Sequence, residues 1–313
     1  MQIVVIGGAG VLGQALLRAI VARGALTRAD GVPAPVRRVI AIDRAQPAKL
    51  FVESRVEYVR ADVGGARLMQ AVMGTLTDSV FHVWDGGAGG GQPTPSFALA
   101  DSLRDLFAAC QLQSARPKVV LAGSFAAEGD GAISNEAPSA PPQSREGLTA
   151  LIGELLLEEA ARRGKVDGRT LRLALIAGAP GDAAFLGELV PALLEGRPAR
   201  CPIPSGAPMW LTSAQAAARA LLHAHELPAA VWQKAGVLNA PARTLSVDAL
   251  LQAAAHLSGR PLASPELEAD PALSEALSQR PSRVAIEAAL TLGFEDGLDA
   301  EALVRDLITS EAS

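Results

Sequence analysis

The first half of the chain alternates short apolar runs, rich in β-branched residues, with amphipathic stretches of helical period. The apolar runs predict strands at residues 3–6, 39–42, 56–60, 80–83, 119–122 and 171–176. The amphipathic stretches predict helices at residues 11–23, 66–73, 97–111 and 147–162. Continuous apolar strands that alternate strictly with helices are typical of a parallel sheet covered on both faces. We therefore predict an α/β fold with a doubly wound parallel sheet, a Rossmann fold, whose ligand lies at the carboxyl ends of the strands.

The second half of the chain differs in composition, with helices separated by links rich in proline and glycine. These helices are predicted at residues 183–194, 213–225, 247–257 and 300–308. The segment GVLNAP, residues 236–241, predicts a short strand that returns to the sheet. We expect residues 1–177 to form the sheet domain and residues 178–313 to form a smaller, mainly helical region that caps the substrate. Two long loops, 84–96 and 128–143, follow predicted strands and should lie over the ligand crevice.

Composition and charge argue against several classes of protein. Apolar residues make up 49% of the 313 residues, so a large core can form and extended disorder is not expected. The net charge is −5 and the basic residues are scattered, which argues against nucleic-acid or anionic-membrane partners. No apolar run approaches the roughly 20 residues of a membrane span, and the segment MQIVVIGG lacks signal-peptide features. Cys110 and Cys201 lie in apolar surroundings that suit a reducing compartment, so we expect a soluble, cytoplasmic protein.

A glycine-rich segment, GGAGVLG, follows the first predicted strand and opens directly into a helix. Gly7 permits a tight turn, Gly10 allows the backbone to approach a pyrophosphate, and Gly13 allows the helix to pack closely on the strand. The first helical residues, Val11 and Leu12, present unpaired backbone N–H groups to the same anion. A glycine-rich turn without a ligand is the alternative. The position between a strand and a helix favours a dinucleotide-binding site over that alternative.

Asp43 ends the second long predicted strand, in VIAIDR. An acid at this position accepts hydrogen bonds from both ribose hydroxyls and repels a 2′-phosphate, which favours NAD over NADP. Arg44 could accommodate a phosphate, so NADP is the less favoured alternative. The interval from the glycines is longer than usual, and we interpret residues 27–38 as a loop insertion that accounts for it. Asp62 and Val63, after the third long strand, are candidates for the adenine edge or for a strand-end turn.

With these residues placed, the chain resembles the extended short-chain dehydrogenase/reductases, the NAD-dependent epimerase/dehydratase family. Within that family it is similar to the D-erythronate dehydrogenase-like branch. The resemblance is carried by the segments VVIGGAGVLGQ, VFHV, VVLAGSFAAEG, IGELLLEEAARRGKVDGRTLRLALI, WLTSAQAAARALLHAHELPA and LNAPARTLSV. These segments run over nearly the whole chain, and the middle ones are the most specific.

The resemblance implies a catalytic serine or threonine, a tyrosine, and a lysine four residues after the tyrosine. In the family the lysine lowers the tyrosine pKa, and the phenolate exchanges a proton with the substrate hydroxyl while hydride passes to the nicotinamide. Aligning the segment IGELL places Ser124 at the serine position, Glu146 at the tyrosine position and Ala150 at the lysine position. The one tyrosine of the chain, Tyr58, is followed four residues later by Asp62, so the pair occurs nowhere in the sequence.

Other positions depart from the family pattern as well. The segment HVWD places the bulky Trp84 and the acidic Asp85 where the family has small residues, and we expect Trp84 beside the pyrophosphate or the nicotinamide. Leu99 stands where the family has a supporting asparagine, and Ala179 stands where it has an arginine. Losses at several functional positions beside intact glycines indicate changed or abandoned chemistry.

The individual polar candidates each have two interpretations. Glu146 either replaces the tyrosine as the proton-transfer group, with burial able to raise its pKa, or is a surface or cap residue near a helix start. Ser124 either binds a ligand oxygen or closes a strand-end turn. His82 is more simply a packed, hydrogen-bonded histidine than a base. His223 and His225 lie two residues apart on a helix and make a poor metal pair, so no metal site is predicted.

These candidates leave three functions open. The first is an NAD-binding protein of this family that runs a modified oxidoreductase or epimerase reaction on a small hydroxylated or sugar-acid substrate, or turns over weakly. The second is a non-catalytic regulatory protein that binds a dinucleotide or metabolite. The third is a redox-silent lyase or isomerase that uses Glu146, Ser124 and Asp85.

The helix predicted at residues 147–162 also bears on assembly, because it has two apolar faces. One face is made of Leu148, Leu151, Ile152 and Leu155, and the other of Ala150, Gly153, Leu157 and Ala161. One of them can cover the sheet, which leaves the other for a partner. The resemblance implies that this helix pairs with its counterpart in a homodimer, and a larger monomeric core is the alternative.

Overall fold

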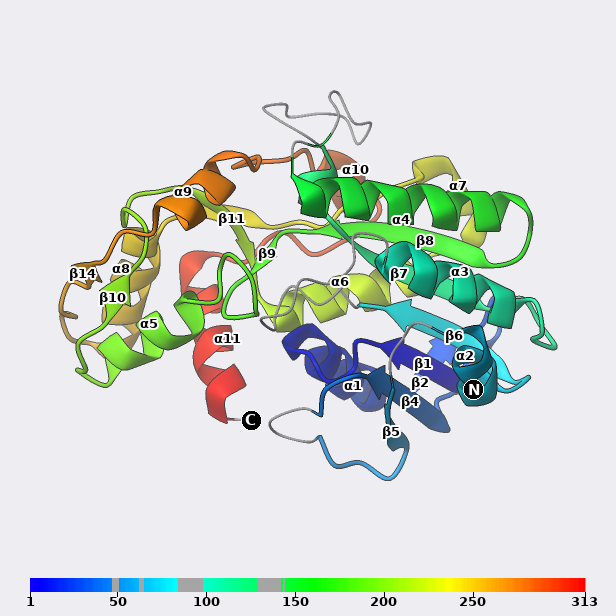
Figure 1. Ribbon diagram of the computed structural model, residues 1–313. Helices are drawn as coiled ribbons and strands as arrows, with labels where there is room; N and C mark the ends of the chain where they lie inside the picture. Colours follow the sequence, from blue (N-terminus) through cyan, green and yellow to red (C-terminus); the bar gives the residue numbers. More distant parts are fainter. Residues whose placement is uncertain (47–50, 62–64, 84–97, 129–141, 143, 313) are drawn as a thin grey trace.

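The computed structural model describes residues 1–46, 51–61, 65–83, 98–128, 142 and 144–312. Its main element is a seven-stranded sheet in which every pairing is parallel (Figure 1). In sheet order the strands are β12 (Leu238–Asn239), β8 (Asp167–Leu173), β7 (Lys118–Ser124), β6 (Thr77–His82), β1 (Gln2–Ile6), β4 (Arg38–Asp43) and β5 (Val56–Arg60). The order reverses between β1 and β6, where a doubly wound sheet opens its ligand crevice. The predicted doubly wound α/β fold is confirmed.

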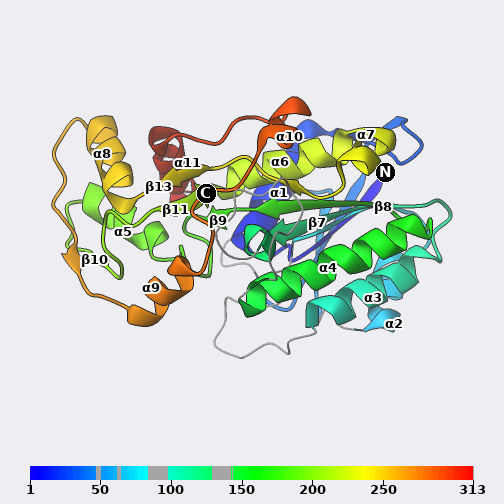
Figure 2. The same cartoon turned by 90° about the horizontal axis from the view of Figure 1, so that it is seen from above.

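Helices cover both faces of this sheet, because successive strand residues are buried on opposite sides (Figure 2). Ile3 and Val5 of β1 pack into one buried cluster, and Val4 and Ile6 pack into another. The first face is covered by α1 (Val11–Arg23), α6 (Ala214–Glu226), α7 (Ala229–Ala235) and α10 (Glu287–Thr291). The second face is covered by α2 (Ala66–Met73), α3 (Ala98–Cys110) and α4 (Arg145–Arg162).

The remaining elements form a smaller region around a third buried cluster, at the left of Figure 1. Its helices are α5 (Leu186–Leu194), α8 (Val247–Ser258), α9 (Pro271–Ser278) and α11 (Ala300–Ala312). Its strands are β9 (Leu175–Ile176), β11 (Met209–Thr212) and β13 (Arg243–Leu245) in one small sheet, and β10 (Arg200–Cys201) and β14 (Glu266–Leu267) in another. Among the described helices, none combines the length and the apolar character needed to cross a membrane.

Two sequence expectations need correction. Residues 27–38 are not a plain loop insertion, because β2 (Ala25–Thr27) and β3 (Pro33–Pro35) form an antiparallel pair there. Glu226 on α6 fixes this pair by accepting hydrogen bonds from the backbone N–H and the hydroxyl of Thr27. The strand predicted at residues 171–176 is two strands, since β8 belongs to the large sheet and β9 pairs with β11 in the small one.

The carboxyl end of α6 is held against the sheet by two buried cations. Lys118 donates from Nζ to the carbonyl of His225 at 2.9 Å, and Arg169 donates from Nη1 to the carbonyls of Ala224 and His225. Cations favour this end of a helix because its last carbonyls lack intrahelical donors. The ring nitrogens of His225 form hydrogen bonds with Ser79 Oγ and Glu226 Oε1. Burial lowers the pKa of His225 to about 4. His225 is therefore a neutral packing residue of the core.

The orientation of α4 shows which of its two faces is buried. Gly153 lies against α3, where an added Cβ would be 3.2 Å from a methyl carbon of Leu99, and Leu157 is fully buried. Leu148 and Leu155 are 51% and 56% exposed. The small-residue face therefore packs on the sheet domain, and the leucine face points outward.

Candidate functional site

The glycine loop after β1 has the geometry of a phosphate cradle. Gly7 has a φ of 90°, which only glycine adopts readily. A Cβ on Gly13 would lie 2.1 Å from the carbonyl oxygen of Gly7, so no side chain fits between the helix and the loop. Gly10 is the N-cap of α1, and the first turn of α1 contains no acidic residue. Val11 and Leu12 are the first residues of α1, and no side-chain oxygen of the N-cap bonds to the N–H groups of this turn. These N–H groups fit a dinucleotide pyrophosphate.

Asp43 lies at the carboxyl end of β4, beside this loop. Its Oδ2 accepts a hydrogen bond from the N–H of Ala9 at 3.0 Å, and its Oδ1 accepts one from the N–H of Ala45 at 3.1 Å. The carboxylate is therefore fixed next to the glycine loop, at the place expected for a ribose. Asp62, Val63 and Trp84, the other candidates for cofactor contacts, lie outside the described residues, as does Asp85.

Tyr58 and Gln14 form hydrogen bonds that connect the glycine loop to β5. Gln14 is buried on α1 and donates from Nε2 to the carbonyl of Gly8 at 2.6 Å and to the Tyr58 hydroxyl at 3.1 Å. The Tyr58 hydroxyl donates to the carbonyl of Phe51 at 3.2 Å. The one tyrosine of the chain is thus a structural link behind the glycine loop. Gln14 was missed by the sequence analysis, although it directly follows Gly13.

Ser124 and Glu146 meet at the carboxyl end of the sheet. Ser124 ends β7, and its hydroxyl donates to Oε1 of Glu146 at 2.7 Å. The N–H of Ala126 donates to Ser124 Oγ at 3.2 Å. Ser144 is the N-cap of α4 and accepts from the N–H of Gly147, so Glu146 stands in the first turn but is not the capping residue.

Arg280, which follows α9, completes this cluster from the far end of the chain. Its Nη2 donates to Oε2 of Glu146 at 2.5 Å, and its Nε donates to Asp182 at 2.9 Å. Its side chain is only 10% exposed, and the guanidinium carbon lies 5.8 Å from the centre of the Phe125 ring. The sequence analysis missed both Arg280 and Asp182.

Arg280 decides the ionisation of Glu146. Burial on its own raises the pKa of Glu146, as the sequence analysis considered for a proton-transfer group. The hydrogen bond and the charge of Arg280, together with the hydrogen bond from Ser124, outweigh burial and lower the pKa of Glu146 below its ordinary value. Glu146 is therefore an ionised and weak base at neutral pH. Ala150, one turn further along α4, is buried and supplies no ammonium group.

A network of buried charged side chains lies next to the end of β7 that carries Ser124. Arg172 on β8 pairs in register with Gly123 and makes two hydrogen bonds of 2.8 Å to Glu154 on α4. Arg172 also donates to Glu128 at 3.2 Å, and Asn239 on β12 donates to the same Glu128 oxygen at 2.7 Å. This network joins β8, α4 and β12 immediately behind the candidate site. No motif in the sequence indicated it.

The histidines do not contribute to this site. His82 is fully buried on β6, its Nε2 lies 3.1 Å from the Ser102 hydroxyl, and burial lowers the pKa of His82 to about 4. His223 lies 2.9 Å from the carbonyl of Leu292. Over the part of the chain that the structure describes, no group of three histidine, cysteine or acidic residues is placed to hold a metal ion.

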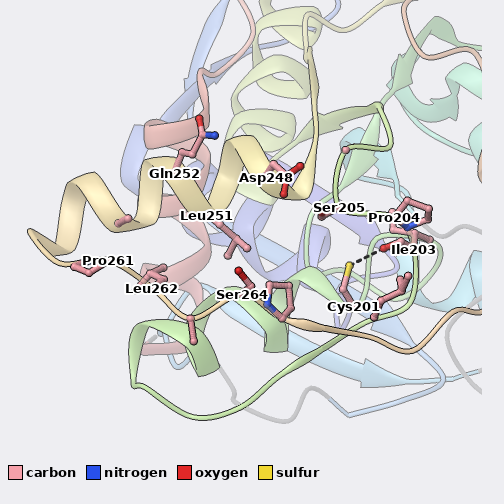
Figure 3. Close-up of a pocket in the computed structure, with 15 residues that line it drawn as sticks. Cys201, Ile203, Pro204, Ser205, Asp248, Leu251, Gln252, Pro261, Leu262 and Ser264 are labelled. Atoms are coloured by element: carbon pink, nitrogen blue, oxygen red, sulfur yellow. Dashed lines mark hydrogen bonds between the residues drawn. The ribbon is translucent and has the colours of Figure 1, made fainter.

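A separate cavity of about 590 Å³ lies in the smaller region, between α8 and the strands β10 and β14 (Figure 3). Asp248, Leu251 and Gln252 border it from α8, and Cys201 borders it from β10. The Cys201 thiol donates to the carbonyl of Ile203 at 3.0 Å. None of the candidate site residues lines this cavity.

Comparison with known proteins shows the family of this chain. The sequence model described as "NAD dependent epimerase/dehydratase family" matches residues 3–240. The chain belongs to this family. A D-erythronate dehydrogenase from Cupriavidus necator is 30% identical, over 97% of this chain and 97% of that protein. The family resemblance seen in the sequence is thereby confirmed.

Solved structures of family members share the whole architecture. A nucleoside-diphosphate-sugar epimerase from Agrobacterium tumefaciens superposes with a TM-score of 0.84 at 24% identity, covering 100% of this chain and 94% of that one. A UDP-glucuronic acid 4-epimerase from Bacillus cereus, in complex with UDP-glucuronic acid and NAD, superposes with a TM-score of 0.71 at 20% identity, covering 100% and 99%. At these identities the likeness concerns the fold.

Proposed function

We propose that this protein is an NAD-dependent oxidoreductase that acts on a small hydroxylated acid through a Ser124–Glu146 pair. The observation that carries the proposal is the 2.7 Å hydrogen bond between Ser124 Oγ and Glu146 Oε1 at the carboxyl end of β7. The acceptor of this bond, Glu146, is the residue that the alignment with the family sets in place of the tyrosine. The substrate class is supported by the D-erythronate dehydrogenase that is 30% identical over 97% of the chain.

The cofactor in this proposal is NAD rather than NADP, because the Asp43 carboxylate, held beside the glycine loop, would repel a 2′-phosphate. The residues proposed to hold the dinucleotide are Gly7, Gly10, Val11, Leu12, Gly13, Asp43, Asp62, Val63 and Trp84. We further propose that residues 1–177 hold the cofactor and that residues 178–313 cap the substrate, apart from β12, α6, α7 and α10, which belong to the large sheet and its cover. The cytoplasmic location is a proposal too, supported by the two buried, free cysteines.

Bound NAD would supply the hydride acceptor, and the protein side chains would handle the proton. Ser124 Oγ donates a hydrogen bond to Glu146, so it could take up the proton of a substrate hydroxyl while its own proton moves to Oε1 of Glu146. Glu146 is a weaker base than usual because of Arg280, and Ala150 supplies no charge to compensate. We therefore expect slow turnover at neutral pH.

Glu146→Gln and Ser124→Ala are each expected to lower kcat by about 10²- to 10⁴-fold, the usual contribution of a positioned acid–base group. The assay follows NADH formation from C4 sugar acids, with NADP as the alternative cofactor and slower turnover expected with it. Glu158→Gln is the matched control, because Glu158 is exposed on the same helix. Unchanged turnover in Glu146→Gln would mean that the proton leaves by another route.

A second function, a non-catalytic protein that senses a dinucleotide or metabolite, is favoured by one observation. Arg280 engages Oε2 of Glu146 and also pairs with Asp182, which lowers the capacity of Glu146 to accept a proton. NAD binding without NADH formation from any C4 sugar acid would support this second function over the first.

We also propose that the protein is a homodimer joined through the outward leucine face of α4. Leu148→Glu combined with Leu155→Glu is expected to raise the dimer dissociation constant by about 100-fold or more, because each protomer loses two exposed leucines from the proposed interface. Analytical ultracentrifugation measures this. Leu267→Glu is the control, since Leu267 is 59% exposed on β14, away from α4. A wild type that sediments as a monomer contradicts the proposal.

A further inference from the structure

The hydrogen-bond polarity of Ser124 is fixed by its neighbours. A serine hydroxyl carries one proton, and here that proton is directed to Glu146 Oε1. The oxygen also accepts from the N–H of Ala126. What Ser124 retains for a ligand is a lone pair, so it offers an acceptor and no donor.

Glu146 has the same polarity, because an ionised carboxylate only accepts hydrogen bonds. Arg280 keeps it ionised and occupies its second oxygen, and Asp182 in turn holds Arg280 at 2.7 and 2.9 Å. Among the residues that the structure describes, the charged groups at Glu146 are Arg280 and Asp182 from the second half of the chain and the exposed Arg145 on its own helix. Ser124 and Glu146 together therefore form an acceptor surface at the carboxyl end of β7.

We propose that the chain Ser124–Glu146–Arg280–Asp182 selects the alcohol member of an alcohol–ketone pair, with Arg280 as the positioning residue that fixes this preference. The inference rests on the proposed function, since it concerns the same site. An alcohol donates its hydroxyl proton to Ser124. A ketone oxygen has only lone pairs and would face the lone pair of Ser124, unless the serine proton leaves Glu146 and gives up a hydrogen bond to a charged group.

Charge adds a constraint on the orientation of the ligand. The Glu146 carboxylate is the charged group hydrogen-bonded to Ser124, and its oxygens, like those of a ligand carboxylate, only accept hydrogen bonds. The two carboxylates therefore repel each other, so a hydroxy acid binds with its hydroxyl toward Ser124 and its carboxylate away from Glu146. The ligand class is thus a small hydroxy acid whose hydroxyl, rather than its carboxylate, meets Ser124.

The test compares 2-hydroxybutyrate with 2-oxobutyrate, and 3-hydroxybutyrate with acetoacetate, by titration calorimetry. ADP-ribose occupies the dinucleotide site without permitting turnover. The wild type is expected to bind each hydroxy acid about tenfold to a hundredfold more tightly than its oxo partner, the range for a hydrogen bond to a charged group. Ser124→Ala should bring the ratio close to one. Equal affinities, tighter binding of the oxo acids, or no binding of either acid to the wild type would overturn the inference.

The dependence on pH separates a positioning role from a merely structural one. The preference exists while Glu146 is ionised and is lost as the pH falls through the Glu146 pKa, because a protonated carboxyl can donate. The wild-type ratio should therefore stay flat from about pH 8 to about pH 5, where the probes remain ionised. Arg280→Gln should make the ratio decline within this range, and Arg280→Lys, which keeps the charge, should restore the flat profile. Identical profiles for the two Arg280 variants would contradict the role of its charge.

The same variants allow a check without any ligand. Carboxyl resonances followed by NMR should place the Glu146 pKa below its ordinary value in the wild type and in Arg280→Lys, and higher in Arg280→Gln. Failure of ADP-ribose binding would count against the dinucleotide proposal alone, because the acids can still be titrated without it.

Discussion

Replacing Arg172 by methionine is expected to lower the free energy of unfolding by about 3–5 kcal/mol. Arg172 and its two acidic partners are almost completely buried, and its guanidinium is the shared cation of Glu154 and Glu128. Methionine fills a similar volume but leaves two carboxylates buried without that charge. Removing one partner of a buried ion pair is costly for this reason, even where the intact pair contributes little. Urea unfolding followed by circular dichroism measures the change.

Arg38→Met is the matched control for this prediction. Arg38 pairs with Glu57 on neighbouring strands of the same sheet, but both side chains are about half exposed. An exposed pair of this kind contributes about 0–1 kcal/mol, so the control should unfold close to the wild type. Equal losses in the free energy of unfolding for Arg172→Met and Arg38→Met would contradict the prediction. That result would mean that protonation or water compensates the two buried carboxylates.

Gly13→Ala is expected to abolish dinucleotide binding and to destabilise the protein by about 1–3 kcal/mol or more. The added methyl group would lie 2.1 Å from the carbonyl oxygen of Gly7 and 2.8 Å from the Cα of Gly8. Both neighbours are backbone atoms of the loop that turns between β1 and α1, so they cannot move aside without opening the cradle. Thermal unfolding and a titration with NAD report the two effects separately.

Gly10→Ala separates the binding of the ligand from the folding of the loop. A Cβ at Gly10 would meet only the Gly7 oxygen, at 3.6 Å, and the φ of −69° suits alanine. The fold should therefore change by less than about 0.5 kcal/mol. The affinity for NAD should still fall, by about tenfold or more, because the methyl group stands where the backbone approaches the pyrophosphate. Wild-type affinity in Gly10→Ala would place the dinucleotide elsewhere.

The large sheet could be predicted from sequence because its inner strands, such as β1 and β4, are buried on both faces and appear as continuous apolar runs. The helix predicted at residues 147–162 begins two residues earlier, at Arg145, because Ser144 caps it. The small strands of the capping region were missed. A strand such as β10 contains two residues, which is too short for an alternating hydrophobic pattern. It pairs with β14 more than sixty residues away, so the local sequence does not predict it. The helix α9 did have a local signal, Asp270 followed by Pro271, which was not used.

The candidate site was predictable to the extent that local motifs define it. The glycines and Asp43 follow from their positions at a helix start and a strand end, and Ser124 and Glu146 follow from the alignment with the family. Arg280 did not follow, because it reaches Glu146 across 134 residues and from a segment without a motif. The interpretation of Glu146 therefore lacked the one contact that determines its charge. Family alignment identified Glu146 as the residue that replaces the tyrosine. Only the three-dimensional contacts show that Arg280 and Ser124 donate hydrogen bonds to its carboxylate.

The interleaving of the two halves limits how this protein can change. Helix α6 belongs to the second half by sequence, yet its apolar side covers the first face of the large sheet, and Lys118 and Arg169 of that sheet bind its last carbonyls. Exchange of residues 178–313 for those of a relative would replace this cover, and Lys118 and Arg169 would lose the helix carbonyls that they bind. A chimera that takes only its smaller region from a relative must therefore keep α6 together with the strands that this helix covers.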